Sequence, residues 1–450
     1  MPATENTEGN QQQLKQSLPE SNSQRVVHRG EILHLLADPV DNPEAIEFLP
    51  DGALVVADGH IEALGQAQDV IQGLPDNTPI IHHHNALITP GFIDCHVHYP
   101  QYQVIASYGT QLLEWLNTHT FPEEMKFSDQ TYARQVASSF LDELLSNGTT
   151  TALVFGTVHP ESVDAFFDEA RRRNLRMICG KVMMDRNAPT ELLDTAEQSA
   201  IESEALIKRW HGCERLGYAV TPRFAPTSTP EQLTVAAHLL DKHPGVMLHT
   251  HLAENTDECA WVKELFPEQR SYLDVYDHYG LLSNRSLFAH SIELDNKDWQ
   301  RIKETGSSIA HCPLSNLFIG SGLFNMQQAF AHDIKLGLGT DVGGGDSFSI
   351  LRTINEAYKI QQLQGMSLDP LKSFYLSTQG GAIALSLDKY IGNFNKDKEA
   401  DFNIIDYNAT PLIRARLQTC TTLQEKLFVL QMLGDDRAIR QTWVAGNAVN

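Results

Sequence analysis

The chain has 450 residues, of which 42% are hydrophobic and 20% are charged, a composition typical of a globular protein with a large core. Its 34 basic and 57 acidic residues give a formal net charge of −23, which argues against a nucleic acid or an anionic membrane as partner. No stretch approaches the ~18 consecutive apolar residues that indicate a membrane-spanning helix.

The first 25 residues are rich in Gln, Ser, Asn and Glu and contain no apolar run. We therefore expect residues 1–25 to form a disordered tail, and not a secretory signal. The six cysteines are scattered without Cys-x-x-Cys pairing, which predicts reduced thiols and a cytoplasmic location. The missing Pro-Cys-x-x-Cys pattern also excludes the zinc site of cytidine-deaminase-type enzymes.

Short β-strands are expected at both ends of the chain. Two apolar runs, at 29–36 and 53–61, lie near the start, and Asp58-Gly59 predicts a hairpin turn in the second. Runs at 401–405 and 442–449 have the same character. We expect residues 26–86 and 386–450 to combine into one small β-sandwich domain.

The middle of the chain alternates between strands and helices. Apolar, β-branched runs recur at 87–97, 149–156, 175–184, 216–226, 245–252, 286–292, 307–312 and 335–341. Helical patterns separate several of them, at 131–145, 161–173, 190–210 and 230–242. This alternation predicts an α/β fold, a (β/α)8 TIM-like barrel over residues 87–385. A doubly wound open sheet is the alternative, but no Gly-rich nucleotide loop follows the first strand.

Polar residues that suit a metal ion stand at the ends of these strands, where barrel enzymes carry their chemistry. His96 and His98 point to one face of the first strand, because side chains alternate along a strand. With His251 and Asp341, they make a set of three imidazoles and a carboxylate, which leaves room for water on a catalytic zinc. Such a set is permissive, so iron is not excluded.

Each of the other histidines near this set has more than one candidate role. His249 shares a face with the ligand candidate His251, and we expect it to pack inside the barrel or to support a ligand. His290 is a candidate further ligand, or a group that orients the attacking hydroxide. His311 is either a pocket residue or a histidine of the core. Residues 82–84 are a run of three histidines that we expect on the surface.

Two charged residues are candidates for work on a substrate. Glu254 follows His251 by three residues, within reach of a substrate held over the metal, and is a candidate for proton transfer. Its alternative role is that of an acidic residue at the start of a helix. Arg223 ends another strand at the barrel mouth, where we expect it to carry little of the protein's stability. The Gly-rich segment 339–345 lacks the Lys-Ser/Thr of a phosphate loop.

Five motifs resemble those of the amidohydrolase superfamily, in its deaminase and chlorohydrolase branch. They are Pro-Gly-Phe-Ile-Asp-Cys-His-Val-His (90–98), His-x-His-Leu-Ala-Glu (249–254), Phe-Ala-His-Ser (288–291), His-Cys-Pro-Leu-Ser-Asn (311–316) and Gly-Thr-Asp-Val-Gly-Gly-Gly (339–345). The segments 99–102 and 112–123, with Arg223-Phe224, are similar to the guanine deaminase family in particular. The resemblance covers roughly residues 26–450.

The resemblance implies hydrolysis of guanine to xanthine and ammonia by a metal-activated hydroxide. It implies one Zn²⁺ per chain on the four ligands above, and a homodimer. The catalytic residues would be Glu254, Asp341 and His290, and the substrate contacts Gln101, Arg223, Phe224, Trp115, His251 and Glu254. Two alternatives remain: a related aminohydrolase acting on a pterin or a triazine, or a scaffold without activity.

Overall fold

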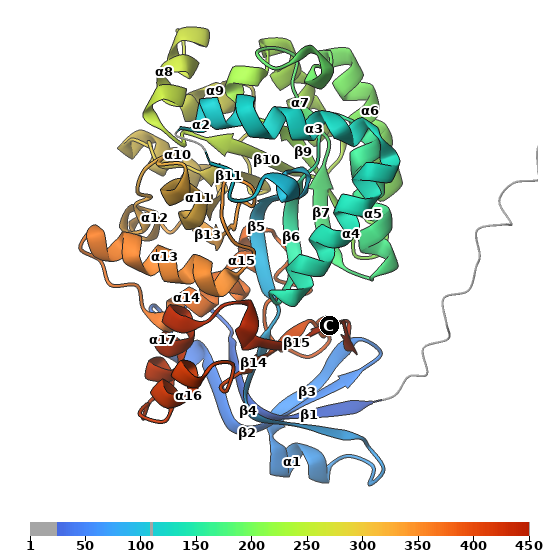
Figure 1. Ribbon diagram of the computed structural model, residues 1–450, viewed down its shortest axis with the longest axis vertical. Helices are drawn as coiled ribbons and strands as arrows, with labels where there is room; N and C mark the ends of the chain where they lie inside the picture. The colour runs from blue at the N-terminus through green and yellow to red at the C-terminus, as the bar shows by residue number, and fades with distance from the viewer. Residues whose placement is uncertain (1–24, 109–110, 450) are drawn as a thin grey trace, which may run out of the picture.

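A parallel barrel and a smaller mixed sheet organise the computed structural model, which describes residues 25–108 and 111–449 (Figure 1). The tail expected over 1–25 thus lies, apart from Arg25, outside the described residues. Among the helices of the described part of the chain, none has the length and hydropathy needed to cross a membrane.

Eight parallel strands form the barrel and confirm the expected fold. The first and last strands of the barrel lie side by side and close it. Hydrogen bonds join their ends: the backbone N–H of Asp341 donates to the carbonyl of His96 at 2.9 Å, and the backbone N–H of His98 donates to the carbonyl of Val342 at 3.1 Å. The two first strands are buried along their whole length, as parallel strands covered on both faces are. In order around the barrel the strands are β5 (Phe92–His98), β6 (Thr149–Phe155), β7 (Arg176–Gly180), β9 (Gly217–Pro222), β10 (Met247–Leu252), β11 (Ser286–His290), β12 (Ser308–His311) and β13 (Lys335–Leu338), with the short β8 (Val182–Met183) paired to β9.

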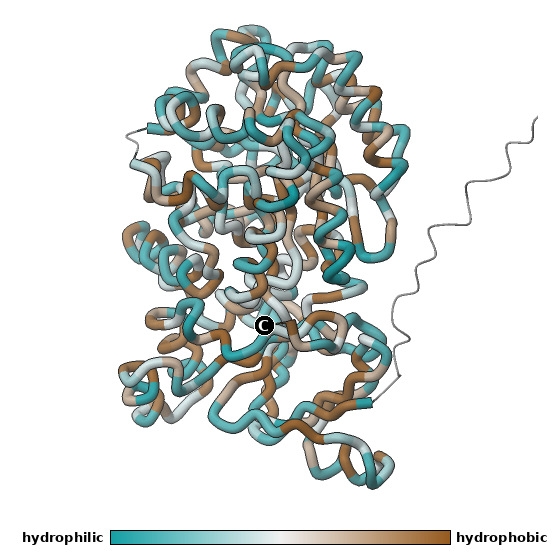
Figure 2. The backbone as a smooth tube through the Cα atoms, turned by 45° about the vertical axis from the view of Figure 1, so that its right-hand side comes forward, coloured by the Kyte–Doolittle hydropathy of each residue, from teal (hydrophilic) through white to brown (hydrophobic). Residues whose placement is uncertain are grey.

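Helices surround the barrel and cover its outer face with apolar side chains, except α15, the last of them, whose Ala382 and Ala384 join the cluster inside the barrel. Along them the chain alternates between hydrophobic and hydrophilic stretches, as expected of helices that bury one side (Figure 2). They are α4 (Gln130–Ser146), α5 (Pro160–Arg172), α6 (Ala196–Trp210), α7 (Pro230–Lys242), α8 (Thr256–Leu265), α9 (Tyr272–His278), α10 (Asn296–Thr305), α11 (Pro313–Phe318), α12 (Met326–Ala331), α13 (Ile350–Leu363), α14 (Pro370–Ser377) and α15 (Gln379–Ala384). The expected helix over 190–210 begins later than predicted, since 190–192 form a separate 3-10 turn.

The two ends of the chain meet in the small β domain, as expected. Its strands join edge to edge in one seven-stranded sheet, with apolar clusters on both faces, rather than in two separate sheets. In order across the sheet they are β16 (Asn447–Ala448), β15 (Ile439–Val444), β14 (Phe402–Asp406), β4 (Ile80–Pro90), β1 (Val26–Leu35), β2 (Ile46–Ala57) and β3 (His60–Gln66). The helices α1 (Ala67–Gln72), α16 (Pro411–Leu417) and α17 (Leu423–Leu433) also belong to the terminal segments.

The apolar run at 87–97 was expected to be one strand, and the structure corrects this. Gly91 divides the run into the end of β4, in the small sheet, and β5, in the barrel. A Cβ at Gly91 would lie 2.1 Å from Thr150 Oγ1, so only glycine allows the chain to pass so close to β6. One continuous hydrophobic stretch therefore serves both sheets.

A β-bulge in β5 aims the histidines inward. Ile93 and Cys95 belong to the apolar cluster inside the barrel, and Val97 belongs to the outer one. Between Asp94 and Val97 the pairing with β6 shifts by one residue. The extra residue reverses the alternation, so that His96 and His98 face the barrel interior.

Buried ion pairs join the barrel to the small β domain at the end opposite the histidines. Arg215, before β9, donates to Glu399 Oε2 at 2.7 Å and also pairs with Asp401. Arg176, at the start of β7, donates to Glu399 as well, at 2.6 Å from its Nε. Burial alone would raise the pKa of Glu399, but the two guanidinium groups hold it below its ordinary value.

Candidate active site

Four side chains from three strand ends of the barrel converge on one point. His98 Nε2 lies 3.3 Å from His96 Nε2 and 3.2 Å from His251 Nε2. Asp341 Oδ1 lies 3.2 Å from His96 Nε2 and 3.3 Å from His98 Nε2. Ligand atoms that share one tetrahedral zinc at ~2.0–2.1 Å are themselves roughly 3.3 Å apart. These four distances match ligand atoms around one ion; the three histidines form one close group, and Asp341 belongs with His96 to a second.

The surroundings of these side chains also suit a metal. His251 Nδ1 lies 2.7 Å from the carbonyl oxygen of Arg223, so this nitrogen carries the proton and donates it, and Nε2 keeps its lone pair. Burial lowers the pKa of the three imidazoles, although Asp341 opposes it, which favours the neutral form that ligates. Burial alone would raise the pKa of Asp341, but His96 and its neighbours hold it well below the ordinary value.

Two backbone features place these groups. Asp94, in β5, accepts hydrogen bonds from the backbone N–H of His96 at 3.2 Å and of Thr340 at 3.1 Å, which joins the two chain segments that carry His96, His98 and Asp341. His290 and Asp341 adopt left-handed backbone conformations, with φ of 65° and 50°. Such strain is rare outside glycine and is common at functional sites. Here it turns both side chains toward the barrel axis.

His290 and Glu254 lie beside this set. His290 Nδ1 donates to Asn316 Oδ1 at 2.9 Å, which leaves Nε2 facing Glu254 Oε2 at 3.5 Å and Asp341 Oδ2 at 3.6 Å. Ser321 donates to Glu254 Oε1 at 2.7 Å. Burial raises the pKa of Glu254 above its ordinary value, although His290 opposes it. A buried carboxyl with a raised pKa is suited to proton transfer near neutral pH.

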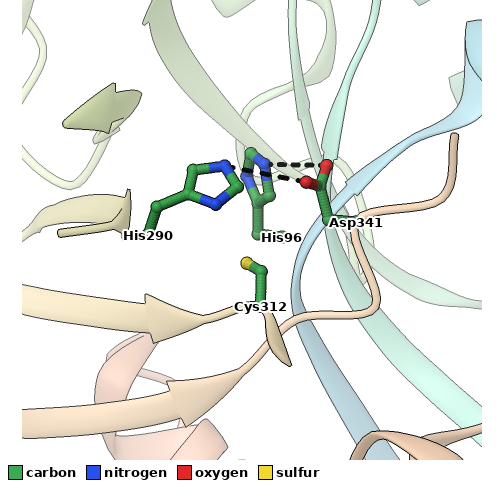
Figure 3. Close-up of side chains that lie close together, drawn as sticks. All are labelled: His96, His290, Cys312 and Asp341. Atoms are coloured by element: carbon green, nitrogen blue, oxygen red, sulfur yellow. Dashed lines mark ion pairs between the residues drawn. The ribbon is translucent and has the colours of Figure 1, made fainter. Parts of the chain in front are cut away.

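Cys312 was not among the expected site residues, yet it lies in the same cluster. Its Sγ is within 4.8 Å of ligand atoms of His96, His290 and Asp341 (Figure 3). Burial raises the pKa of this thiol well above its ordinary value, which keeps it protonated. Its place follows from the alternation along β12, since Ala310 and Cys312 both belong to the cluster inside the barrel.

The same alternation decides the positions of the two remaining strand histidines. His249 faces inward, and its Nε2 lies 2.8 Å from His96 Nδ1, behind the converging atoms. His311 faces the outer layer and stacks on Phe324 with ring centroids 4.8 Å apart. His311 is therefore not part of the pocket. In the run at 82–84, the outer two histidines are exposed and only His83 is buried.

A pocket opens onto the converging side chains. Its apolar wall comes largely from a helical segment after β5, formed by α2 (Leu112–Trp115), a π-helical turn at Leu116–Thr120 and α3 (Phe121–Glu124). In Figure 1 this segment crosses the end of the barrel away from the small sheet. The lining residues are His98, Gln101, Leu112, Trp115, Leu116, Arg223, Phe224, His251, Glu254, Glu258, His290, Ile319, Asp341 and Gly344.

All the expected substrate contacts line this pocket, and the structure adds groups that the motifs did not indicate. Glu258 lines it too, and accepts from Tyr272 Oη at 2.8 Å and from the backbone N–H of Glu254 at 2.8 Å. Burial and the charge of Glu254 raise the pKa of Glu258 to about 7. Glu124 pairs with Arg223 behind the pocket wall. The periodic pattern of a helix can indicate that Glu258 and Glu124 lie on a buried face. It cannot indicate which side chains they contact.

The fold and the site define a class: a (β/α)8 barrel with closely spaced histidines and an aspartate suited to a metal ion, and a buried glutamate beside them, at the carboxyl ends of its strands. Residues 87–449 match the amidohydrolase family, and the chain belongs to that family.

Within the family, the chain is similar to guanine deaminases. It is 52% identical to the guanine deaminase of Escherichia coli K12 over 414 residues, which cover 91% of this chain and 94% of that protein. The solved E. coli guanine deaminase superposes with a TM-score of 0.92 at 50% identity, covering 94% of this chain and 99% of that one. The guanine deaminase of C. acetobutylicum, solved with bound guanine in the active site, gives a TM-score of 0.85 at 30% identity, covering 95% and 100%.

Proposed function

We propose that this protein hydrolyses guanine to xanthine and ammonia. One observation carries the proposal: a single buried pocket combines a metal-ligating set, a proton-transfer carboxyl and a paired donor and acceptor for a base. The similarity to guanine deaminases over most of the chain supports it. The guanine-bound relative supports the choice of substrate.

His96, His98, His251 and Asp341 would hold the metal. Zn²⁺ fits best, because neutral imidazoles and a carboxylate suit it, and iron is the alternative. When bound, Zn²⁺ supplies a Lewis acid that makes hydroxide available near neutral pH.

Asp341, Glu254 and His290 would handle the protons. Glu254 takes one proton from the attacking water and delivers it to ring nitrogen N3. Asp341 takes the second proton of that water as the oxygen bonded to C2 becomes a carbonyl, and this proton passes by way of Glu254 to the departing amine, so that the C2–N bond breaks and neutral ammonia leaves. His290, fixed by Asn316, orients the attacking oxygen through its Nε2.

Arg223, Gln101, Phe224 and Trp115 would bind the base. The guanidinium of Arg223 donates a hydrogen bond to O6 or N7 of guanine. An amine at C6 in place of O6 could not accept this hydrogen bond. Phe224 and Trp115 are almost fully buried in the pocket wall and cover the faces of the planar ring. Assembly as a homodimer and a cytoplasmic location stay predictions.

Ammonia release from a panel of substrates tests the proposal. The purified protein is given guanine, adenine, cytosine, a pterin, a triazine and 8-oxoguanine, and its metal content is measured on the same sample. We expect guanine to be used with the highest kcat/KM and xanthine to appear in step with ammonia. Preference for the pterin or the triazine would favour the related aminohydrolase, and a metal-replete protein without any activity would favour a scaffold.

A further inference from the structure

A buried carboxylate behind the pocket holds both polar groups that face the base. Glu124, at the end of α3, is buried and does not line the pocket. Its carboxylate accepts from Arg223 Nη1 at 3.0 and 2.8 Å, and its Oε1 also accepts from Gln101 Nε2 at 3.2 Å. One side chain therefore orients two others.

The bond to Glu124 decides which end of the Gln101 amide faces the pocket. A glutamine can turn its amide to present either the NH₂ group or the oxygen. A carboxylate accepts only, so Gln101 must direct its NH₂ group at Glu124. Its Oε1 is left to act as an acceptor, and Gly343 keeps room for it, since a Cβ there would lie 2.9 Å from this oxygen.

The same carboxylate fixes the guanidinium of Arg223. Only Nη1 bonds to Glu124, and the ring of Phe121 lies 5.3 Å from the guanidinium carbon. In the described residues, Nε and Nη2 of Arg223 make no hydrogen bond, so their N–H groups remain as donors. Arg223 itself is only 3% exposed and lines the pocket. A donor from Arg223 thus stands next to an acceptor from Gln101.

We propose that Glu124 is a positioning residue that sets this donor–acceptor order, and that the order selects purines with an oxo group at C6 and a protonated N1. The inference rests on the proposed function. Guanine presents O6, an acceptor, next to N1–H, a donor, which complements Arg223 and Gln101. 2,6-Diaminopurine carries the same amine at C2 but reverses the edge, with an amine at C6 and a bare N1. Its C6 amine, a donor, would face the N–H donor of Arg223, and its bare N1, an acceptor, would face Gln101 Oε1. Neither hydrogen bond can then form.

Glu124→Gln tests the inference, because a neutral amide can both donate and accept and so releases Gln101 to turn. For each protein, kcat/KM is measured for guanine and for 2,6-diaminopurine, and the products of reaction at C2 are identified by chromatography. We expect the ratio of kcat/KM for guanine to kcat/KM for 2,6-diaminopurine to fall by at least about 10-fold in Glu124→Gln, because one mismatched hydrogen bond lowers binding by about this factor.

The neighbouring Glu123 supplies a matched control. It is also a buried glutamate of α3, but its carboxylate binds Lys126 at 2.6 Å and Tyr132, away from the pocket. Glu123→Gln is expected to keep the wild-type ratio between the two purines. A structural role of Glu124 would lower both efficiencies together and leave their ratio unchanged.

An unchanged ratio in folded, metal-replete Glu124→Gln would overturn the inference alone. A wild-type protein that releases no ammonia from either purine would overturn the proposed function and the inference with it. If Glu124→Gln does not fold, Gln101→Ala tests the same donor–acceptor order, because it removes the acceptor. The ratio of kcat/KM for guanine to that for 2,6-diaminopurine should then fall by at least about 10-fold. An unchanged ratio in this variant would overturn the inference.

Discussion

Replacement of Arg223 by methionine should impair both recognition of guanine and stability of the fold, for different reasons. A hydrogen bond from a charged group contributes about 1.5–3 kcal/mol, so loss of the bond to the base should lower kcat/KM for guanine by about 10- to 150-fold. The change also strands Glu124, whose side chain is 1% exposed, without its cation. Removal of one partner of a buried ion pair costs about 3–5 kcal/mol, and the lower end applies because Gln101 still donates to Glu124.

A second substitution separates the two effects. In Arg223→Met with Glu124→Gln, no buried charge is left unpaired, so most of the lost unfolding free energy should return. The efficiency toward guanine should stay low, because the donor to the base is still missing. Urea unfolding gives the stability, and ammonia release gives kcat/KM. The reasoning is refuted if the double variant is as unstable as the single one, or if either variant uses guanine at the wild-type rate.

Three further predictions concern the metal, the proton and the fold. His98→Ala should abolish ammonia release and lower bound metal; near-normal turnover with full metal content would remove His98 from the ligand set. Glu254→Gln should keep its metal and lose at least ~100-fold in kcat, since an amide cannot transfer a proton; retained turnover would leave Glu254 a structural role. Arg215→Ala should lose about 3 kcal/mol of unfolding free energy, with KM unchanged, because it removes the guanidinium of Asp401 while Arg176 still pairs with Glu399; unaltered urea unfolding would contradict this.

The barrel, and the meeting of the four candidate ligands at one mouth of it, were predictable because they follow from local periods. Apolar residues that recur every second residue indicate a strand, and those that recur about every 3.6 residues indicate a helix. Parallel strands place their carboxyl ends at one mouth, so His96, His98, His251 and Asp341 could be expected together before any coordinates were known.

Features that depend on packing between elements could not be predicted from the sequence. The hydrophobic run at 87–97 carries no mark of the division at Gly91, because the reason is the approach of Thr150 from another strand. The place of His311 at a strand end left open whether it lies in the pocket or in the core, and the alternation along β12 turns it outward, into the core.

Arg223 illustrates the same limit for energetics. As a polar residue at the barrel mouth it was expected to matter little for stability. The structure pairs it with the fully buried Glu124, which lies 99 residues earlier in the chain. A helical pattern can show that Glu124 is buried, but only the tertiary fold shows that Arg223 compensates its charge.

Titration of metal-free protein with Zn²⁺ tests the central claim most directly. Protein stripped by a chelator is reloaded in steps, and ammonia release from guanine is measured against bound metal per chain. The account predicts activity that rises linearly and saturates at a single ion per chain, with xanthine formed in equal amount to ammonia. Full activity in the metal-free protein would contradict it, as would a fully loaded protein that leaves guanine intact.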